Sequence, residues 1–233
     1  RSEVDYLISV LLILAVIGSA AGTFLLETFG LPDLVGAIGL LVAVGILVFK
    51  GTETIETFLA GWSFVLYATY VVFFVWALSA FGDSISVALE AGEARPGWAL
   101  SGLRYGALQV FLVPAILFAT RHIRTRREAL WAGALTGPIA ILPGLLFFLV
   151  MAGHYPAILE RPLPANYLLE LLGSRAFQIG FQLVLLGTLI ETGSGLIHAF
   201  NERIAGVFSL RGARMPGALR TAVAVALLIA GSL

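Results

Sequence analysis

Seven long apolar segments constrain the fold of this chain more than any other feature. A helix needs about 20 apolar residues to cross a bilayer core. Inside hydrocarbon every backbone polar group must find a partner in the chain itself, so only helices and closed barrels span a membrane. Barrel strands would be shorter and would alternate polar with apolar residues. We therefore predict an all-α, polytopic membrane helix bundle of about seven transmembrane helices: Tyr6–Leu26, Leu34–Phe49, Phe58–Phe81, Gly102–Thr120, Ala129–Met151, Phe177–Phe200 and Ala218–Leu233.

Composition narrows the class further. Of the 233 residues, 59% are hydrophobic and 12% are charged, whereas soluble domains carry about 25% charged residues. The net charge of zero provides no basic field for nucleic acid, and the absence of cysteine excludes disulfides and Cys–zinc sites. The chain begins at Arg1, and its last apolar run, Thr221–Leu233, is too short to cross a bilayer. We expect one transmembrane domain, residues 1–233, incomplete at both ends.

Basic residues predict the orientation of the segments. Ten of the 14 Lys and Arg residues fall on the N-terminal side of the predicted helices, and four fall on the other side. Because positive residues gather in cytoplasmic loops, the N-terminus of this chain is predicted to be cytoplasmic. The segment Arg121–Arg127 carries four of the ten, and we interpret it as an anchor against anionic lipid heads. The long outer loops are predicted at Gly82–Ser101 and Ala152–Ala176.

The sixth apolar segment holds the strongest candidate for function. Glu191 lies near its middle, where a charge costs about 2.5–3.5 kcal/mol on insertion scales. At 100° per residue one helix face carries a polar stripe, with Ser194 at its edge. That stripe consists of Thr188, Glu191, Gly195, His198 and Glu202.

Three interpretations of this stripe remain open. In the first, the stripe is an interhelical hydrogen-bond seam, in which glycines allow close approach. In the second, it is an ion or substrate pathway, with Glu191 as proton carrier or cation ligand and with hydroxyl oxygens from Thr192 and Ser194. Or it serves intramembrane catalysis, since Gly193-Ser194-Gly195 resembles the serine motif of rhomboid proteases. That motif needs glycine where this chain has Thr192. No HExxH motif is present either, so we predict no enzyme, no catalytic residue and no metal site.

The fourth apolar segment is the second candidate. It contains Gly102, Gly106 and a mid-span proline, Pro114, together with Tyr105 and the amide of Gln109. Spans interrupted by glycine and proline point to broken helices at transporter binding sites. The alternative is a plain GxxxG packing face, because proline is common in membrane helices.

Two stretches resemble a known family. Glu191–His198, followed by Asn201–Ile204, is similar to the YkvI-type membrane proteins, described as amino-acid permeases of the amino acid–polyamine–organocation superfamily. Gly22–Pro32 resembles that family's turn between its third and fourth helices. The resemblance implies a LeuT-like fold of two inverted five-helix repeats, with the seven segments as core helices three to nine. It also implies a bacterial or archaeal plasma membrane as the location.

The resemblance implies roles for individual residues. Thr192 and Ser194 would be the helix-eight part of a sodium-type site, with Glu191 beside them, and broken helix six would place Tyr105, Gly106 and Gln109 near the substrate. We therefore predict a secondary active transporter of small organic solutes such as amino acids, coupled to Na⁺ or H⁺. Glu191 would couple ion movement to solute transport. Thr192 and Ser194 would supply oxygen ligands to the ion, and His198 would be a second polar relay on the same face. The expected partners are the lipid bilayer and a small solute, with no cofactor except a bound Na⁺. The alternatives are a non-transporting scaffold or sensor subunit and, third, an intramembrane hydrolase.

Overall fold

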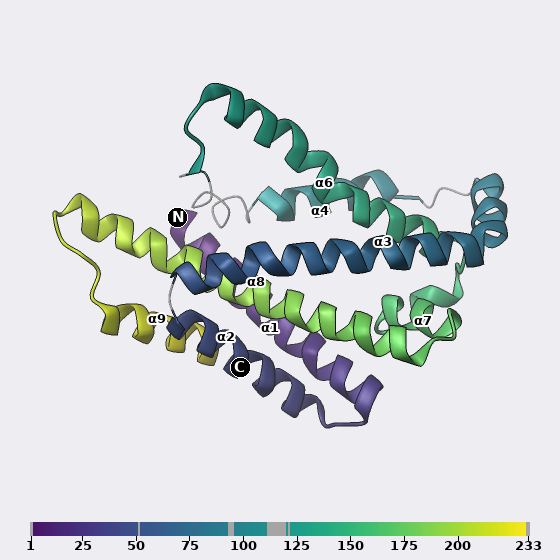
Figure 1. The fold of residues 1–233 in the computed structure, drawn as a ribbon, viewed down its shortest axis with the longest axis horizontal. Coiled ribbons are helices and arrows are strands. Elements are labelled where there is room, and N and C mark those ends of the chain that lie inside the picture. Colours follow the sequence, from purple (N-terminus) through teal and green to yellow (C-terminus); the bar gives the residue numbers. More distant parts are fainter. Residues whose placement is uncertain (1, 51, 93–95, 111–119, 121, 232–233) are drawn as a thin grey trace. The chain divides into compact units, whose positions relative to one another are not determined.

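The computed structural model describes residues 2–50, 52–92, 96–110, 120 and 122–231, and all regular structure in these ranges is helical. The elements are α1 (Ser2–Phe29), α2 (Asp33–Lys50), α3 (Thr52–Ala91), α4 (Trp98–Val110), α6 (Arg126–Ala152), the 3₁₀ helix η2 (Ala157–Glu160), α7 (Pro164–Leu171), α8 (Arg175–Leu210) and α9 (Gly217–Ala230). Figure 1 shows their order along the chain.

The predicted all-helical class is confirmed for the described residues. Five helices, α1, α2, α3, α6 and α8, are long and apolar enough to cross a membrane, which is compatible with an integral membrane protein. The apolar helix α9 has 14 residues and is shorter. The predicted fourth span falls on α4 and on residues 111–119, which lie outside the described part, as does Pro114. The seven-span count and the LeuT-like topology stay predictions.

Both predicted outer loops contain helix. Helix α3 continues ten residues past Phe81 to Ala91, and that stretch contains no proline to break it. It ends at Gly92, whose φ of 60° is a left-handed conformation that glycine adopts without strain. The second loop contains η2 and α7, and α8 runs ten residues beyond Phe200 to Leu210. Hydropathy marks the apolar part of a helix, whereas capping residues mark its ends.

The chain forms two compact units. Unit 1 comprises Arg1–Phe64, Gly102–Phe118 and Leu185–Leu233, and unit 2 comprises Val65–Ser101 and Ala119–Val184. Helices α3 and α8 therefore each supply residues to both units.

In unit 1, α1 and α2 form a tight hairpin (Figure 1). Gly30 ends α1 with a φ of 68°, and its N–H donates to the carbonyl of Leu26 at 2.9 Å. Two glycines allow the helices to touch through their backbones. A Cβ on Gly22 would lie 2.7 Å from the Asp33 carbonyl oxygen, and a Cβ on Gly36 would overlap the backbone of Ala21. The hairpin packs against α8 and α9 through a shared apolar core of Val10, Leu14, Ile17, Leu40, Val44, Ile197, Ala224 and Leu227.

In unit 2, an aromatic cluster joins α3, α6 and α8. Phe73 and Phe181 are almost completely buried, and their ring centroids lie 5.1 Å apart. Phe147 of α6 stacks on Phe73 at 5.2 Å, and Tyr70 lies 6.0 Å from Phe181. Edge-to-face and offset aromatic pairs of this kind add to the stabilisation that burial alone provides.

A buried group of amides lies beside this cluster. Asn166 of α7 accepts hydrogen bonds at its Oδ1 from Gln178 and Gln182 of α8. Arg175 donates to the Oε1 of Gln178 at 2.9 Å. All three amides are less than a tenth exposed. Because buried amides require partners, these bonds fix α7 against α8.

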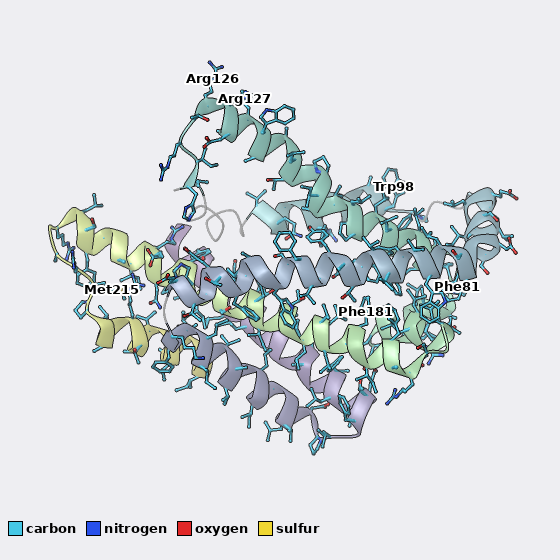
Figure 2. All side chains as sticks on the ribbon, in the orientation of Figure 1. Phe81, Trp98, Arg126, Arg127, Phe181 and Met215 are labelled. Carbon is cyan, nitrogen blue, oxygen red and sulfur yellow. The ribbon has the colours of Figure 1, made fainter. Side chains whose placement is uncertain are left out.

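The start of α6 explains part of the basic segment 121–127. Thr125 is the N-cap and accepts from the Glu128 N–H at 3.2 Å, while the Glu128 carboxylate accepts from the Arg124 N–H at 2.8 Å. This pair resembles a capping box, with the carboxylate bonded to the N–H of the residue before the N-cap. It leaves Arg126 and Arg127 projecting from the first helical turn (Figure 2). Arg121 lies outside the described residues.

His154 follows α6 and packs inside unit 2. Its ring lies edge-on to Phe81, with centroids 4.5 Å apart, and 6.1 Å from Tyr167. Arg161 stacks over the Tyr167 ring, 4.5 Å from its centroid. Burial lowers the pKa of His154 below its ordinary 6.5. The folded protein therefore holds this histidine in its neutral form at neutral pH.

We expect acidification to destabilise unit 2 through His154. The unfolded chain binds a proton near pH 6.5, whereas the folded chain binds it only at lower pH, so stability falls as pH drops through this window. Melting temperatures of wild type and His154→Phe at pH 7.5 and pH 5.5 measure the effect. The wild type should lose more stability than the variant on acidification. An equal loss in both proteins would show that another group titrates.

Candidate functional site

Glu191 lies near the middle of the long helix α8. It is the seventeenth of the 36 residues of that helix and is half-buried. Ser63 of α3 faces it, with its Oγ 3.3 Å from Glu191 Oε1. Both residues belong to unit 1. The predicted intramembrane carboxyl thus has a polar partner on a neighbouring helix.

The hydroxyl of Ser63 has a second contact. Its Oγ also lies 2.8 Å from the carbonyl oxygen of Leu59 in the same helix. A hydroxyl carries one hydrogen and two acceptor lone pairs. When this hydrogen points to Leu59, the oxygen is left to accept from a protonated Glu191. When it points to Glu191, it donates to the ionised carboxylate. The pair therefore offers a hydrogen bond to either protonation state.

The predicted hydroxyl ligands Thr192 and Ser194 lie on different faces of α8. Thr192 is exposed, and its hydroxyl donates to the Thr188 carbonyl at 2.9 Å. Ser194 is fully buried and donates to the Glu191 carbonyl at 3.1 Å. Two residues two positions apart are separated by about 200° around a helix. The structure does not bring these two hydroxyls together.

Glycines on α8 allow other helices to approach closely. A Cβ on Gly193 would lie 2.9 Å from Val44 Cγ2 and 3.0 Å from Ile17 Cδ1. A Cβ on Gly187 would overlap the indole of Trp62. This part of α8 is closely packed against α1, α2 and α3, as the seam interpretation predicts.

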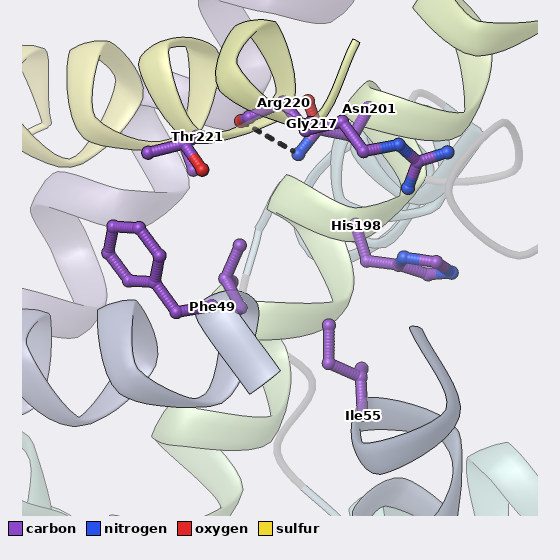
Figure 3. Close-up of a pocket in the computed structure, with 9 residues that line it drawn as sticks. Phe49, Ile55, His198, Asn201, Gly217, Arg220 and Thr221 are labelled. Carbon is purple, nitrogen blue, oxygen red and sulfur yellow. Dashed lines mark hydrogen bonds between the residues drawn. The ribbon is translucent and has the colours of Figure 1, made fainter. Parts of the chain in front are cut away.

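Farther along α8 the polar face reaches a cavity. His198 is seven residues, or about 10 Å, from Glu191 and falls within 20° of the same face. It is 2% exposed and lines a cavity of about 270 Å³ in unit 1 (Figure 3). The end of α2, the start of α3, α8 and the start of α9 form the walls. The lining residues are Val48, Phe49, Ile55, His198, Asn201, Gly217, Arg220, Thr221 and Ala224.

Two residues on this wall had no predicted role. Asn201 is 3% exposed, and its Nδ2 donates to the Arg220 carbonyl at 3.4 Å, while Arg220 Nη2 lies 2.8 Å from Glu202 Oε1. Asn201 lies three positions after His198 and seven after Ser194, so helical periodicity could have placed it on the buried face. Arg220 entered the sequence argument only as a positive charge. Its pairing with Glu202 joins α9 to α8.

The predicted substrate residues on α4 lie away from this cavity. Tyr105 is 61% exposed, and it accepts a hydrogen bond from Gln109 Nε2 at 2.8 Å. A Cβ on Gly106 would meet nothing within 4 Å. None of the three lines the cavity. Their assignment to a substrate stays a prediction.

The described residues contain no group of three or more His, Asp or Glu side chains placed to hold a metal ion. The site is a set of polar contacts along one helix: the Ser63–Glu191 pair near its middle, and a cavity containing His198 and Asn201 toward its end.

No family model, curated protein or solved structure matches this chain.

Proposed function

We propose that the chain is the central part of a proton-coupled secondary transporter of small organic solutes such as amino acids. The observation that carries this proposal is the Ser63–Glu191 contact at the middle of a long apolar helix. A carboxyl at that depth is costly to keep and marks ion pathways and proton relays. A partner that hydrogen bonds to both of its protonation states is what a reversible proton carrier needs.

Protons are favoured over Na⁺ as the coupling ion. A Na⁺ site needs several oxygen ligands around one point, and the two hydroxyls expected to supply them lie on different faces of α8, Thr192 exposed and Ser194 fully buried. A proton needs only Glu191 and a path. His198, two turns along the same face, lines the cavity and is placed to extend that path.

The proposal keeps the topology implied by the resemblance to YkvI-type permeases. Seven spans would belong to a LeuT-like inverted repeat in a bacterial or archaeal plasma membrane, with the N-terminus of this chain in the cytoplasm. Alternating access would occur by movement of one helix group against another. The five long apolar helices support a polytopic bundle of this kind.

One observation favours a second function, a non-transporting scaffold or sensor subunit. The glycine contacts of Gly187 and Gly193 pack α8 tightly, and the cavity is not lined by α4. A polar stripe that only joins helices needs close packing of this kind and no cavity shared with α4. The hydrolase alternative gains no support, because Ser194 is fully buried and its hydroxyl donates to its own helix.

Glu191→Gln tests the proposed function. Glutamine keeps the shape and the hydrogen bond to Ser63 but carries no titratable proton. The full-length protein should be reconstituted in vesicles, and accumulation of labelled amino acids should be measured under an imposed pH gradient and, separately, a Na⁺ gradient. We expect the variant to lose pH-driven accumulation and to retain solute exchange at equal pH.

The exposed Glu90→Gln is the matched control, since it removes the same charge at the end of α3. It should transport like wild type. Wild-type accumulation by Glu191→Gln would remove Glu191 from the mechanism. A response to the Na⁺ gradient alone would assign coupling to sodium, and no exchange by any variant would favour the scaffold.

A further inference from the structure

The cavity of unit 1 is bounded by the N-terminus of α9. That helix begins at Gly217 after Pro216, and no side chain caps it. Its first intrahelical bonds are donated by the N–H groups of Leu219 and Arg220 to the Pro216 carbonyl. The N–H of Gly217, which lines the cavity, has no acceptor within its own helix. A helix N-terminus of this kind favours an anion through both its N–H groups and its dipole.

Side chains with hydrogen-bond donors line the same cavity. Arg220 pairs with Glu202 through its Nη2. A guanidinium has five N–H donors in total, so donors remain for a ligand. The ring of His198 and the hydroxyl of Thr221 also line the space. In Figure 3 the side chains of Arg220 and His198 extend to the same side. The side chains of this wall therefore offer more hydrogen-bond donors than acceptors to a ligand. The Glu202 carboxylate competes with that ligand for Arg220.

Asn201 provides an independent indication of a ligand. Its amide reaches from α8 to the first turn of α9 (Figure 3) and lines the cavity. It is 97% buried, since 3% is exposed, and its Oδ1 has no hydrogen-bond partner among the described residues. A buried acceptor without a donor is unfavourable. A ligand that carries a hydroxyl next to its anionic oxygens would satisfy it.

The remaining walls indicate where this ligand comes from. Val48, Phe49, Ile55 and Ala224 make them apolar. The cavity lies where α2 ends at Lys50 and α9 begins, at the ends of apolar helices rather than at their centres. Basic pockets between membrane helices at this level bind the phosphates of lipid head groups. A volume of about 270 Å³ suits one phosphate with a small substituent.

We propose that this cavity is a phosphate-binding site. It takes the phosphate of an anionic, hydroxyl-bearing lipid head group or a free phosphate ion. Arg220, Thr221 and the Gly217 N–H hold the anionic oxygens, and Asn201 Oδ1 accepts from the hydroxyl. Glu202 competes with the phosphate for Arg220. The site stands on its own contacts and does not depend on the transport proposal.

The competition by Glu202 makes the test sharp, because two variants are expected to act in opposite directions. Glu202→Gln should strengthen phosphate binding several-fold, since it releases Arg220 and removes a repelling charge. Arg220→Gln should weaken it by at least as much. Arg211→Gln is the matched control, because Arg211 is exposed in the same α8–α9 connection and does not line the cavity.

Binding is measured on the full chain in a neutral detergent and in nanodiscs. In detergent, the melting temperature is followed with sodium phosphate against sodium chloride at equal ionic strength. In nanodiscs, phosphatidylglycerol is compared with phosphatidylcholine. Stabilisation by phosphate identifies the free ion, and stabilisation by phosphatidylglycerol alone identifies the lipid.

Either form of stabilisation, increased by Glu202→Gln and unchanged by Arg211→Gln, supports the site. If Arg220→Gln does not fold, the sign of the Glu202→Gln effect decides. No stabilisation in either arm overturns the proposal. So does a loss as large in Arg211→Gln as in Arg220→Gln, because binding would then follow surface charge alone.

Discussion

Replacing Gly36 with leucine is expected to separate α1 from α2 and to lower the melting temperature by several degrees. Any side chain at this position overlaps backbone atoms, and a Cβ there would lie 2.8 Å from the Cα of Gly22. Backbone atoms cannot rotate away as the end of a flexible side chain can. Overpacking in a tight contact costs about 1–3 kcal/mol, and a contact with backbone belongs at the upper end. Thermal unfolding in detergent, followed by size exclusion, measures the loss.

Gly39→Leu is the control for this experiment. Gly39 lies one turn farther along α2, is exposed, and would meet nothing within 4 Å if it carried a Cβ. Both variants add the same side chain to the same helix. Equal melting temperatures for the two variants would contradict the backbone contact between α1 and α2.

Phe181→Ala is expected to have a comparable or larger effect on unit 2. Phe181 is 1% exposed and its ring lies 5.1 Å from Phe73 and 6.0 Å from both Tyr70 and Phe177. Truncation of a buried phenylalanine costs about 3–5 kcal/mol in soluble proteins. In a bilayer the transfer contribution is smaller, because lipid tails are also apolar, so the lost contacts dominate. The variant should unfold at lower denaturant or temperature.

Leu183→Ala provides the comparison, since Leu183 is 51% exposed and lies two residues along the same helix. A surface truncation usually changes stability by about 0.5 kcal/mol or less. Helical content should be the same in both variants before unfolding. A Phe181→Ala protein as stable as Leu183→Ala would show that the aromatic cluster does not hold unit 2 together.

Apolar run length predicted the long helices well, because a chain in hydrocarbon has few ways to satisfy its backbone. The same signal missed helix outside the apolar runs. Residues 82–91 are more polar than the span before them and were predicted as loop, yet they continue α3 until Gly92. No proline or glycine interrupts the helix between Gly82 and Gly92, and hydropathy does not report where a helix ends outside its apolar part.

The site was predicted only where one residue carried the signal. The position of Glu191 in its segment indicated a buried carboxyl, and the structure places it at the middle of α8. Its partner Ser63 is 128 residues distant in sequence, so no local pattern could pair them. The cavity depends on how the ends of α2, α3 and α9 meet the side of α8, and periodicity along any one segment does not report that meeting.

The shared hydroxyl of Ser63 has a consequence for the protonation of a carboxyl among apolar helices. Once a proton has reached or left the carboxyl, its contact with Ser63 re-forms without opening a backbone hydrogen bond, since turning one O–H by a single torsion changes the hydroxyl from donor to acceptor. Such a rotor switches on the timescale of a side chain rather than that of a helix. Removal of that O–H in Ser63→Ala would leave the carboxyl in place and take away the rotor.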